Sequence, residues 1–100
     1  MSKLLTNSQR RYLRGLAHDL KPVILVGAKG VTDALVQEFS NALDQHELVK
    51  VRIPAEDRED FAAQAAELAR ATGAESVQTI GRTAVYFRRN NDEPKIALPK

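Results

Sequence analysis

The sequence contains no cysteine, and only five of its 100 residues are aromatic. The absence of cysteine excludes disulfide bonds, thiolate metal ligands and thiol nucleophiles. The few aromatic rings are expected mainly in the core, so sequence-specific stacking on nucleobases is not indicated. No apolar run reaches the length that spans a bilayer, and the N-terminus lacks the apolar core of a secretory signal. We therefore expect a cytoplasmic protein without membrane contact.

Residue combinations that support catalysis or metal binding are also missing. His18 and His46 form neither an H-x-x-x-H nor an H-E-x-x-H pair. The carboxylates at positions 56, 57, 59 and 60 lack the alternating spacing and the glycine of an EF-hand, and an acidic helix start explains them better. No serine lies in a G-x-S-x-G motif. We expect no enzyme, no metal, no cofactor and no small-molecule substrate.

The charges are distributed unevenly along what the length and composition indicate to be a single domain, residues 1–100. Residues 1–30 carry six Lys or Arg and one Asp, and residues 76–100 carry five basic and two acidic residues. Residues 31–75 instead carry four basic and ten acidic residues. The pattern predicts one basic face and one acidic face, and a polyanion is the natural partner of the basic face.

Residues 21–32 contain the most informative stretch of the chain. Val23 to Val26 form a short apolar run that predicts a central strand with both faces covered. The loop Gly27-Ala28-Lys29-Gly30 follows, and Thr32 is the expected N-cap of the next helix. The loop matches neither G-x-G-x-x-G nor the P-loop, but it is the G-x-x-G with which KH domains clamp nucleic-acid backbone. Amides at a helix N-terminus favour an anion, although a plain tight turn is an equal alternative.

The remaining pattern predicts an α/β fold in the order α-β-α-β-α-β-β. Thr6 and Gln9 offer a capping box for a helix to about Leu20. Helices are expected from Thr32 to about His46 and from Arg58 to about Thr72, with a strand from Glu47 to Ile53 between them. Two strands, 75–80 and 82–88, flank Gly81. We expect a mixed four-stranded sheet covered by three helices, and a C-terminal tail of about residues 90–100 whose Ile96 and Leu98 dock on the sheet.

Scattered cations accompany the loop lysine, as contacts to phosphate require. An arginine stripe on the first helix is by itself the pattern of an ordinary solvated face. The residues that could form one RNA-contacting surface with loop residues 27–30 are Arg14, Lys21, Thr32, Lys50, Arg52, Arg82, Arg88 and Arg89.

Several separate motifs resemble the CRM domain in its bacterial stand-alone, YhbY-type form. They are Leu13-Arg14-Gly15-Leu16-Ala17-His18, Leu20-Lys21-Pro22-Val23, Gly27-Ala28-Lys29-Gly30-Val31-Thr32, His46-Glu47-Leu48-Val49-Lys50-Val51 and Ile80-Gly81-Arg82-Thr83. The resemblance spans nearly all of residues 4–99. It implies a compact α/β RNA-binding module, similar to the C-terminal domain of a bacterial translation initiation factor. Bacterial members accompany precursors of the large ribosomal subunit, and related domains in plant organelles serve group II intron splicing.

The resemblance also implies which residues contact RNA. It places the RNA-contacting loop at residues 27–30, with Lys21, Lys50 and Arg82 at positions that are usually basic. Near the last strand the family often reads Tyr-Arg-Pro, whereas this chain has Phe87-Arg88-Arg89. The difference removes a tyrosine hydroxyl and adds an arginine.

The resulting prediction is a non-enzymatic RNA-binding protein that associates with ribosomal RNA of large-subunit precursors. Two alternatives stay open at this point. In the first alternative, the chain is a translation-factor-like module on mature ribosomes. In the second, it is a protein-interaction module that uses the acidic third helix. The sequence does not determine the bound RNA site, the oligomeric state or whether the tail orders on binding.

Overall fold

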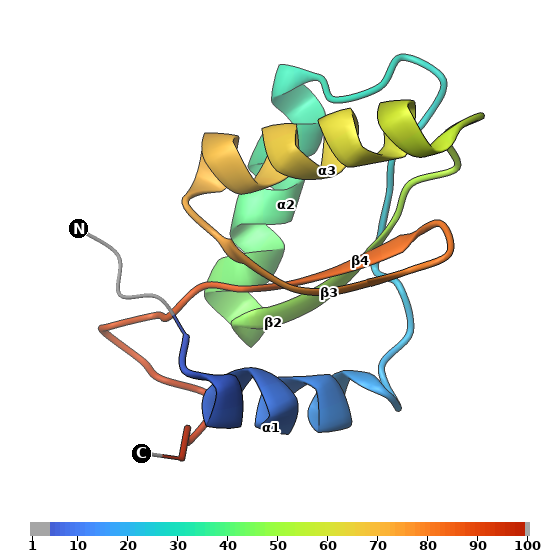
Figure 1. The fold of residues 1–100 in the computed structure, drawn as a ribbon. Helices are drawn as coiled ribbons and strands as arrows, with labels where there is room; N and C mark the ends of the chain where they lie inside the picture. Colours follow the sequence, from blue (N-terminus) through green and yellow to red (C-terminus); the bar gives the residue numbers. More distant parts are fainter. Residues whose placement is uncertain (1–4, 100) are drawn as a thin grey trace.

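The computed structural model describes residues 5–99, so residues 1–4 and Lys100, the end of the predicted tail, lie outside it. Three helices and four strands occur within the described range, which confirms the predicted class and order (Figure 1). The elements are α1 Asn7–Ala17, β1 Ile24–Leu25, α2 Asp33–His46, β2 Leu48–Arg52, α3 Arg58–Thr72, β3 Glu75–Ile80 and β4 Thr83–Phe87.

The helix ends follow the capping residues of the sequence. Thr6 and Gln9 form the predicted capping box of α1, and the Thr32 hydroxyl accepts from the Leu35 N–H at 3.1 Å. Gly73 ends α3 in the left-handed conformation, with φ of 75°. Helix α1 ends at Ala17 and not near Leu20. Pro22 disfavours helical backbone just before it, and the chain leaves α1 through a turn.

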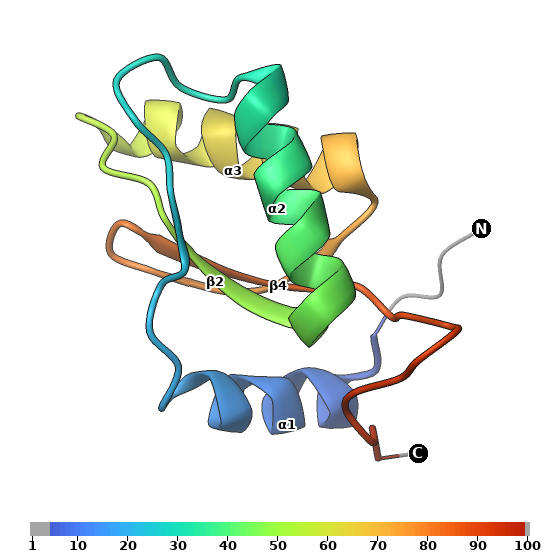
Figure 2. The same cartoon turned by 180° about the vertical axis from the view of Figure 1, so that it is seen from behind.

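The helices cover the two faces of the sheet unequally. Helix α1 lies on one face, whereas α2 and α3 lie on the other (Figures 1 and 2). Leu13 and Ala17 of α1 pack with Leu48, Val85 and Phe87. The other core contains the following larger side chains: Phe39, Leu43, Val51, Ile53, Phe61, Leu68 and Tyr86.

Tyr86 lies in the larger core and does not face solvent. Its ring meets that of Phe39 edge-on at a centroid distance of 5.0 Å, and its hydroxyl donates to the Ala65 carbonyl at 2.7 Å. Burial raises the pKa of Tyr86 above its ordinary value. The expectation that aromatic residues mainly pack in the core is confirmed at this position.

The strand order β1-β2-β4-β3 corrects the prediction for residues 23–26. Among residues 5–99, strand β1 pairs only with β2, in parallel, and is therefore an edge strand. Ile24 and Val26 are buried, but Val23 is 56% exposed and Leu25 61% exposed, so only one face of this run is covered. The prediction was wrong because β3 pairs with β4 and not with β1, and because α1 packs over the end of the sheet that contains Leu48 and Phe87.

Candidate nucleic-acid interface

The loop between β1 and α2 is a tight turn followed by a capped helix. The Gly30 N–H donates to the Gly27 carbonyl at 3.0 Å, and Gly30 has φ of 74°, a conformation that glycine adopts without strain. The Leu35 and Val36 N–H groups donate to Thr32. The N–H groups of the first two residues of α2 have no acceptor within the helix. The loop, in which residues 27–29 are exposed, therefore lies beside a helix N-terminus, an arrangement that favours an anion.

Charge differs between the two sides of this loop. Lys29 is exposed, and it does not line the cavity that defines the inner side of the loop. A cavity of about 320 Å³ lies on the inner side, and its lining includes the loop glycines together with Glu56 and Asp60. Two carboxylates repel a phosphate at short range. An anion is therefore favoured on the outer side of the loop, next to Lys29.

Four of the predicted cations lie along the same edge of the molecule as the loop. The segment from α1 to β1, the loop and the β3–β4 turn all lie on one side in both views (Figures 1 and 2). Lys21, Arg52 and Arg82 are exposed. The Lys50 ammonium donates to the Leu20 carbonyl at 2.8 Å, and the Arg82 guanidinium donates to the Glu56 carbonyl at 3.1 Å. The first bond holds Lys50 beside the segment that carries Lys21, and the second holds Arg82 beside Glu56, which lines the cavity at the loop.

Arg88 does not share this edge. Its guanidinium donates to the Thr72 carbonyl at 3.0 Å, to the Ser40 carbonyl at 2.9 Å and to the Asp44 carboxylate at 2.8 Å. These contacts join the end of α3 to the middle of α2. The geometry assigns Arg88 a structural role between α2 and α3, away from the edge that carries the loop. Arg14 is exposed on α1, where it lines a groove together with Lys50.

Glu47 is a buried carboxylate that sequence reasoning missed. It is fully buried between α2 and β2, with φ of 63°, and it accepts the backbone N–H groups of Asn90, Lys95 and Ile96 at 2.7 to 2.8 Å. The Arg89 guanidinium lies 3.1 Å from the carboxylate. Burial alone raises the pKa of Glu47, but the three N–H groups and the Arg89 charge outweigh burial and hold the pKa below its ordinary value. The only sequence signal for this buried carboxylate was its position as a single acidic residue between a helix and an apolar strand.

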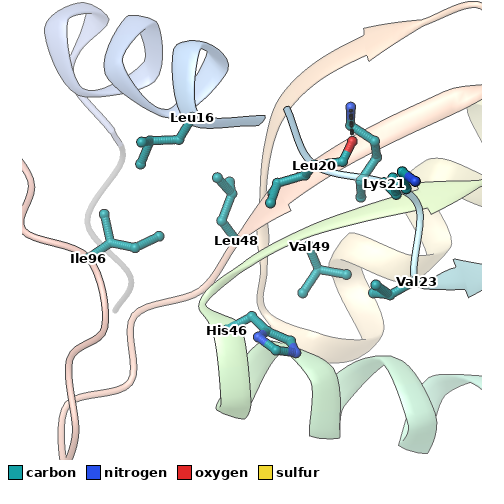
Figure 3. A pocket seen from close by; sticks show the side chains of 9 residues that line it. Leu16, Leu20, Lys21, Val23, His46, Leu48, Val49 and Ile96 are labelled. Carbon is teal, nitrogen blue, oxygen red and sulfur yellow. Dashed lines mark hydrogen bonds between the residues drawn. The ribbon is translucent and has the colours of Figure 1, made fainter. Parts of the chain in front are cut away.

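Glu47 positions the C-terminal tail. Ile96 and Leu98 pack against the cluster beneath α1, which confirms the predicted docking. Ile96 also forms one wall of a cavity of about 410 Å³ between α1 and β2 (Figure 3). The cavity is mainly apolar, and its other walls include Leu16, Leu20 and Leu48.

Two kinds of feature are absent from residues 5–99. No group of three or more His, Cys, Asp or Glu in that range is arranged to hold a metal ion. None of the helices in that range is both long enough and apolar enough to cross a membrane.

Comparison with known proteins shows likeness over almost the whole chain. An RNA-binding protein of Haemophilus influenzae is 42% identical over 96 residues, covering 96% of each chain. The probable RNA-binding protein YqeI of Bacillus subtilis is 36% identical, over 96% of this chain and all of that protein. The solution structure of a hypothetical protein from Staphylococcus aureus matches with a TM-score of 0.82 and 34% identity, over 96% of this chain and all of that one. The model of the CRS1 / YhbY (CRM) domain matches residues 5–88, and the chain therefore belongs to the CRM domain family.

Proposed function

We propose that this protein is a cytoplasmic, non-enzymatic RNA-binding protein that associates with ribosomal RNA of large-subunit precursors during ribosome assembly. The observation that carries the proposal is the gathering of the G-x-x-G loop and four separate cations on one edge of the molecule. The names of the relatives in Haemophilus influenzae and Bacillus subtilis support RNA as the ligand class. The ribosomal assignment extends the family resemblance of the sequence.

The proposed mechanism is electrostatic. A backbone phosphate binds at the outer side of residues 27–30, where Lys29 and the loop amides meet the N-terminus of α2. Lys21, Lys50, Arg52 and Arg82 then contact successive phosphates along the edge, with Arg14 at its far end. Each neutralised phosphate releases counterions, so affinity falls as salt rises. Such contacts select folded RNA by shape and backbone path and not by base sequence.

The loop has two features that suit a rigid phosphate contact. Its turn is closed by the bond from Gly30 to Gly27, and the Thr32 cap fixes the first turn of α2. The inner carboxylates, Glu56 and Asp60, disfavour binding on the wrong side of the loop. The site therefore requires little rearrangement on binding.

Sedimentation of a cell lysate through a sucrose gradient tests the proposal. We expect wild-type protein to migrate with large-subunit precursors at low salt and to leave them as salt rises. Lys29→Glu should weaken this association roughly tenfold or more without unfolding the protein, because Lys29 is exposed. Arg70→Glu is the matched control, since Arg70 lies on α3 and pairs only with Glu67 among the described residues.

The possible outcomes separate the proposal from its rivals. Migration with mature ribosomes only would favour a translation-factor-like module. Association that survives Lys29→Glu unchanged would contradict the loop as the contact site. Protein that stays at the top of the gradient at every salt concentration would contradict the ribosomal assignment.

A further inference from the structure

Helix α1 leaves part of its own face of the sheet uncovered. It packs over the end of the sheet that contains Leu48 and Phe87. Towards the β3–β4 turn, the strand register places one residue from each strand in a single row. That row consists of Leu25, Arg52, Thr83 and Ile80. Ile24, Val51 and Ala84, their neighbours along the strands, are buried in the opposite core, so the row points to the α1 side.

The row combines exposed apolar ends with a cation between them. Leu25 is 61% exposed and Ile80 is 64% exposed, the two highest values among the exposed large apolar side chains. Arg52 lies between them in the register. Lys50, two residues before Arg52 on the same strand and face, continues the positive charge towards α1. The surface therefore offers aliphatic contact and positive charge side by side.

A groove adjoins this row between α1 and the sheet. It has a volume of about 320 Å³, and none of its nine lining residues is acidic. Arg14, His18 and Lys50 supply nitrogen donors, whereas Gln78 and Thr83 supply an amide and a hydroxyl. The cavity at the G-x-x-G loop differs, because Glu56 and Asp60 line it. The groove is thus the better place for a ligand that combines negative charge with hydrogen-bonding edges.

We propose that this open sheet face and its groove bind an unpaired nucleotide segment of the RNA. Phosphates of such a segment contact Arg52, Lys50 and Arg14, while base faces pack on Leu25 and Ile80. Gln78 and Thr83 can each donate and accept hydrogen bonds at base edges. A duplex hides its base faces, whereas unpaired nucleotides expose both faces and edges. The inference rests on the proposed function and extends it, because the loop alone does not distinguish paired from unpaired RNA.

Binding to two matched RNAs tests the inference. The probes are a blunt RNA hairpin whose two strands are joined by a non-nucleotide linker, so that every base is paired, and the same hairpin extended by an unpaired uridine tail. The double variant L25A/I80A should lose affinity for the tailed hairpin by about tenfold, the effect expected from losing roughly one buried aliphatic side chain. Its affinity for the blunt hairpin should not change. Tyr12→Ala is the control, because Tyr12 is a 42% exposed apolar side chain on α1 that does not line the groove.

The outcomes distinguish this inference from the proposed function. Lys29→Glu should weaken binding of both hairpins, because the loop contacts backbone. Equal loss for both RNAs in the double variant, or no loss for either, would overturn the sheet face as a site for unpaired nucleotides. Wild-type protein that binds neither RNA would overturn the proposed function itself. The double variant should keep the thermal unfolding temperature of the wild type, since both positions are exposed.

Photocrosslinking examines the same contact without any substitution. A tailed hairpin that carries 4-thiouridine in its tail should crosslink to wild-type protein within residues 78–83 or 50–52. Crosslinks from the tail confined to residues 27–30 would contradict the inference.

Discussion

Replacing Glu47 by Gln should destabilise the protein strongly, although the two side chains have nearly the same size. One carboxylate oxygen accepts the Lys95 and Ile96 N–H groups, and the other accepts the Asn90 N–H. The Gln amide keeps one acceptor oxygen, but its NH₂ group replaces the other. Depending on the orientation of the amide, the NH₂ group then faces either one backbone N–H donor or two. Hydrogen bonds to charged groups contribute about 1.5–3 kcal/mol, and neutral ones about 0.5–1.5 kcal/mol. The substitution weakens two hydrogen bonds and leaves a third donor without an acceptor. We therefore expect a loss of about 3 kcal/mol in the free energy of unfolding.

Urea unfolding followed by circular dichroism measures this loss. Glu93→Gln is the matched control, because the Glu93 carboxylate is exposed and its ion pair is with Lys95. We expect the control to change stability by less than about 0.5 kcal/mol. Amide hydrogen exchange at Lys95 and Ile96 should accelerate only in the Glu47 variant, since the tail loses its acceptor. Equal stability of the two variants, with unchanged exchange at these amides, would refute the role assigned to Glu47.

Three further predictions concern stability. Because folding lowers the pKa of Glu47, its contribution to stability is present above the ordinary pKa of 4.5 and is lost as pH falls through the lower pKa of the folded protein. In an acid titration, the free energy of unfolding should therefore decline less in Glu47→Gln than in the wild type, and parallel curves would contradict the assignment. Arg88→Ala should lower the free energy of unfolding by about 2 kcal/mol, since it removes the bonds to Ser40 and Thr72, but should change RNA affinity by no more than about twofold. A large affinity loss in the folded variant would show that Arg88 belongs to the RNA surface. Gly73→Ala should cost about 1 kcal/mol at its left-handed position, and a stabilising effect in thermal unfolding would show that the C-cap is misassigned.

Local features of the chain were predictable because they depend on neighbouring residues. The capping box at Thr6 and the caps at Thr32 and Gly73 require only side chains within a few positions. The hairpin around Gly81 was predicted for the same reason, and its φ of 59° confirms the need for glycine in this turn. Docking of Ile96 was predictable from its apolar character in a polar tail.

Features that depend on long-range pairing were not predictable. The run from Val23 to Val26 is uniformly apolar, yet β3 pairs with β4 and not with β1, so β1 is an edge strand. Helix α1 packs over the other end of the sheet, which leaves one face of β1 exposed. The exposed Leu25 therefore became visible as part of a surface only with the strand register. Glu47 gained its three donors from a tail more than 40 residues away. The periodic pattern of apolar residues in the sequence does not indicate a contact between residues so far apart.

The candidate site was predictable in its composition but not in its geometry. The loop and Lys29 follow directly from the sequence motif, and the edge that they share with Lys21 follows from chain proximity. Arg88 was grouped with them by charge alone. The structure instead places its guanidinium between α2 and α3, where backbone carbonyls accept its donors.

The most direct test of the central claim is ultraviolet crosslinking of the protein to RNA in living cells, followed by sequencing of the RNA recovered with it. Wild-type protein should recover large-subunit ribosomal RNA that includes precursor segments absent from the mature molecule. Recovery should fall with Lys29→Glu and persist with Arg70→Glu. Recovery of unrelated RNAs in proportion to their abundance, or equal recovery by both variants, would contradict specific association of this edge with large-subunit precursors.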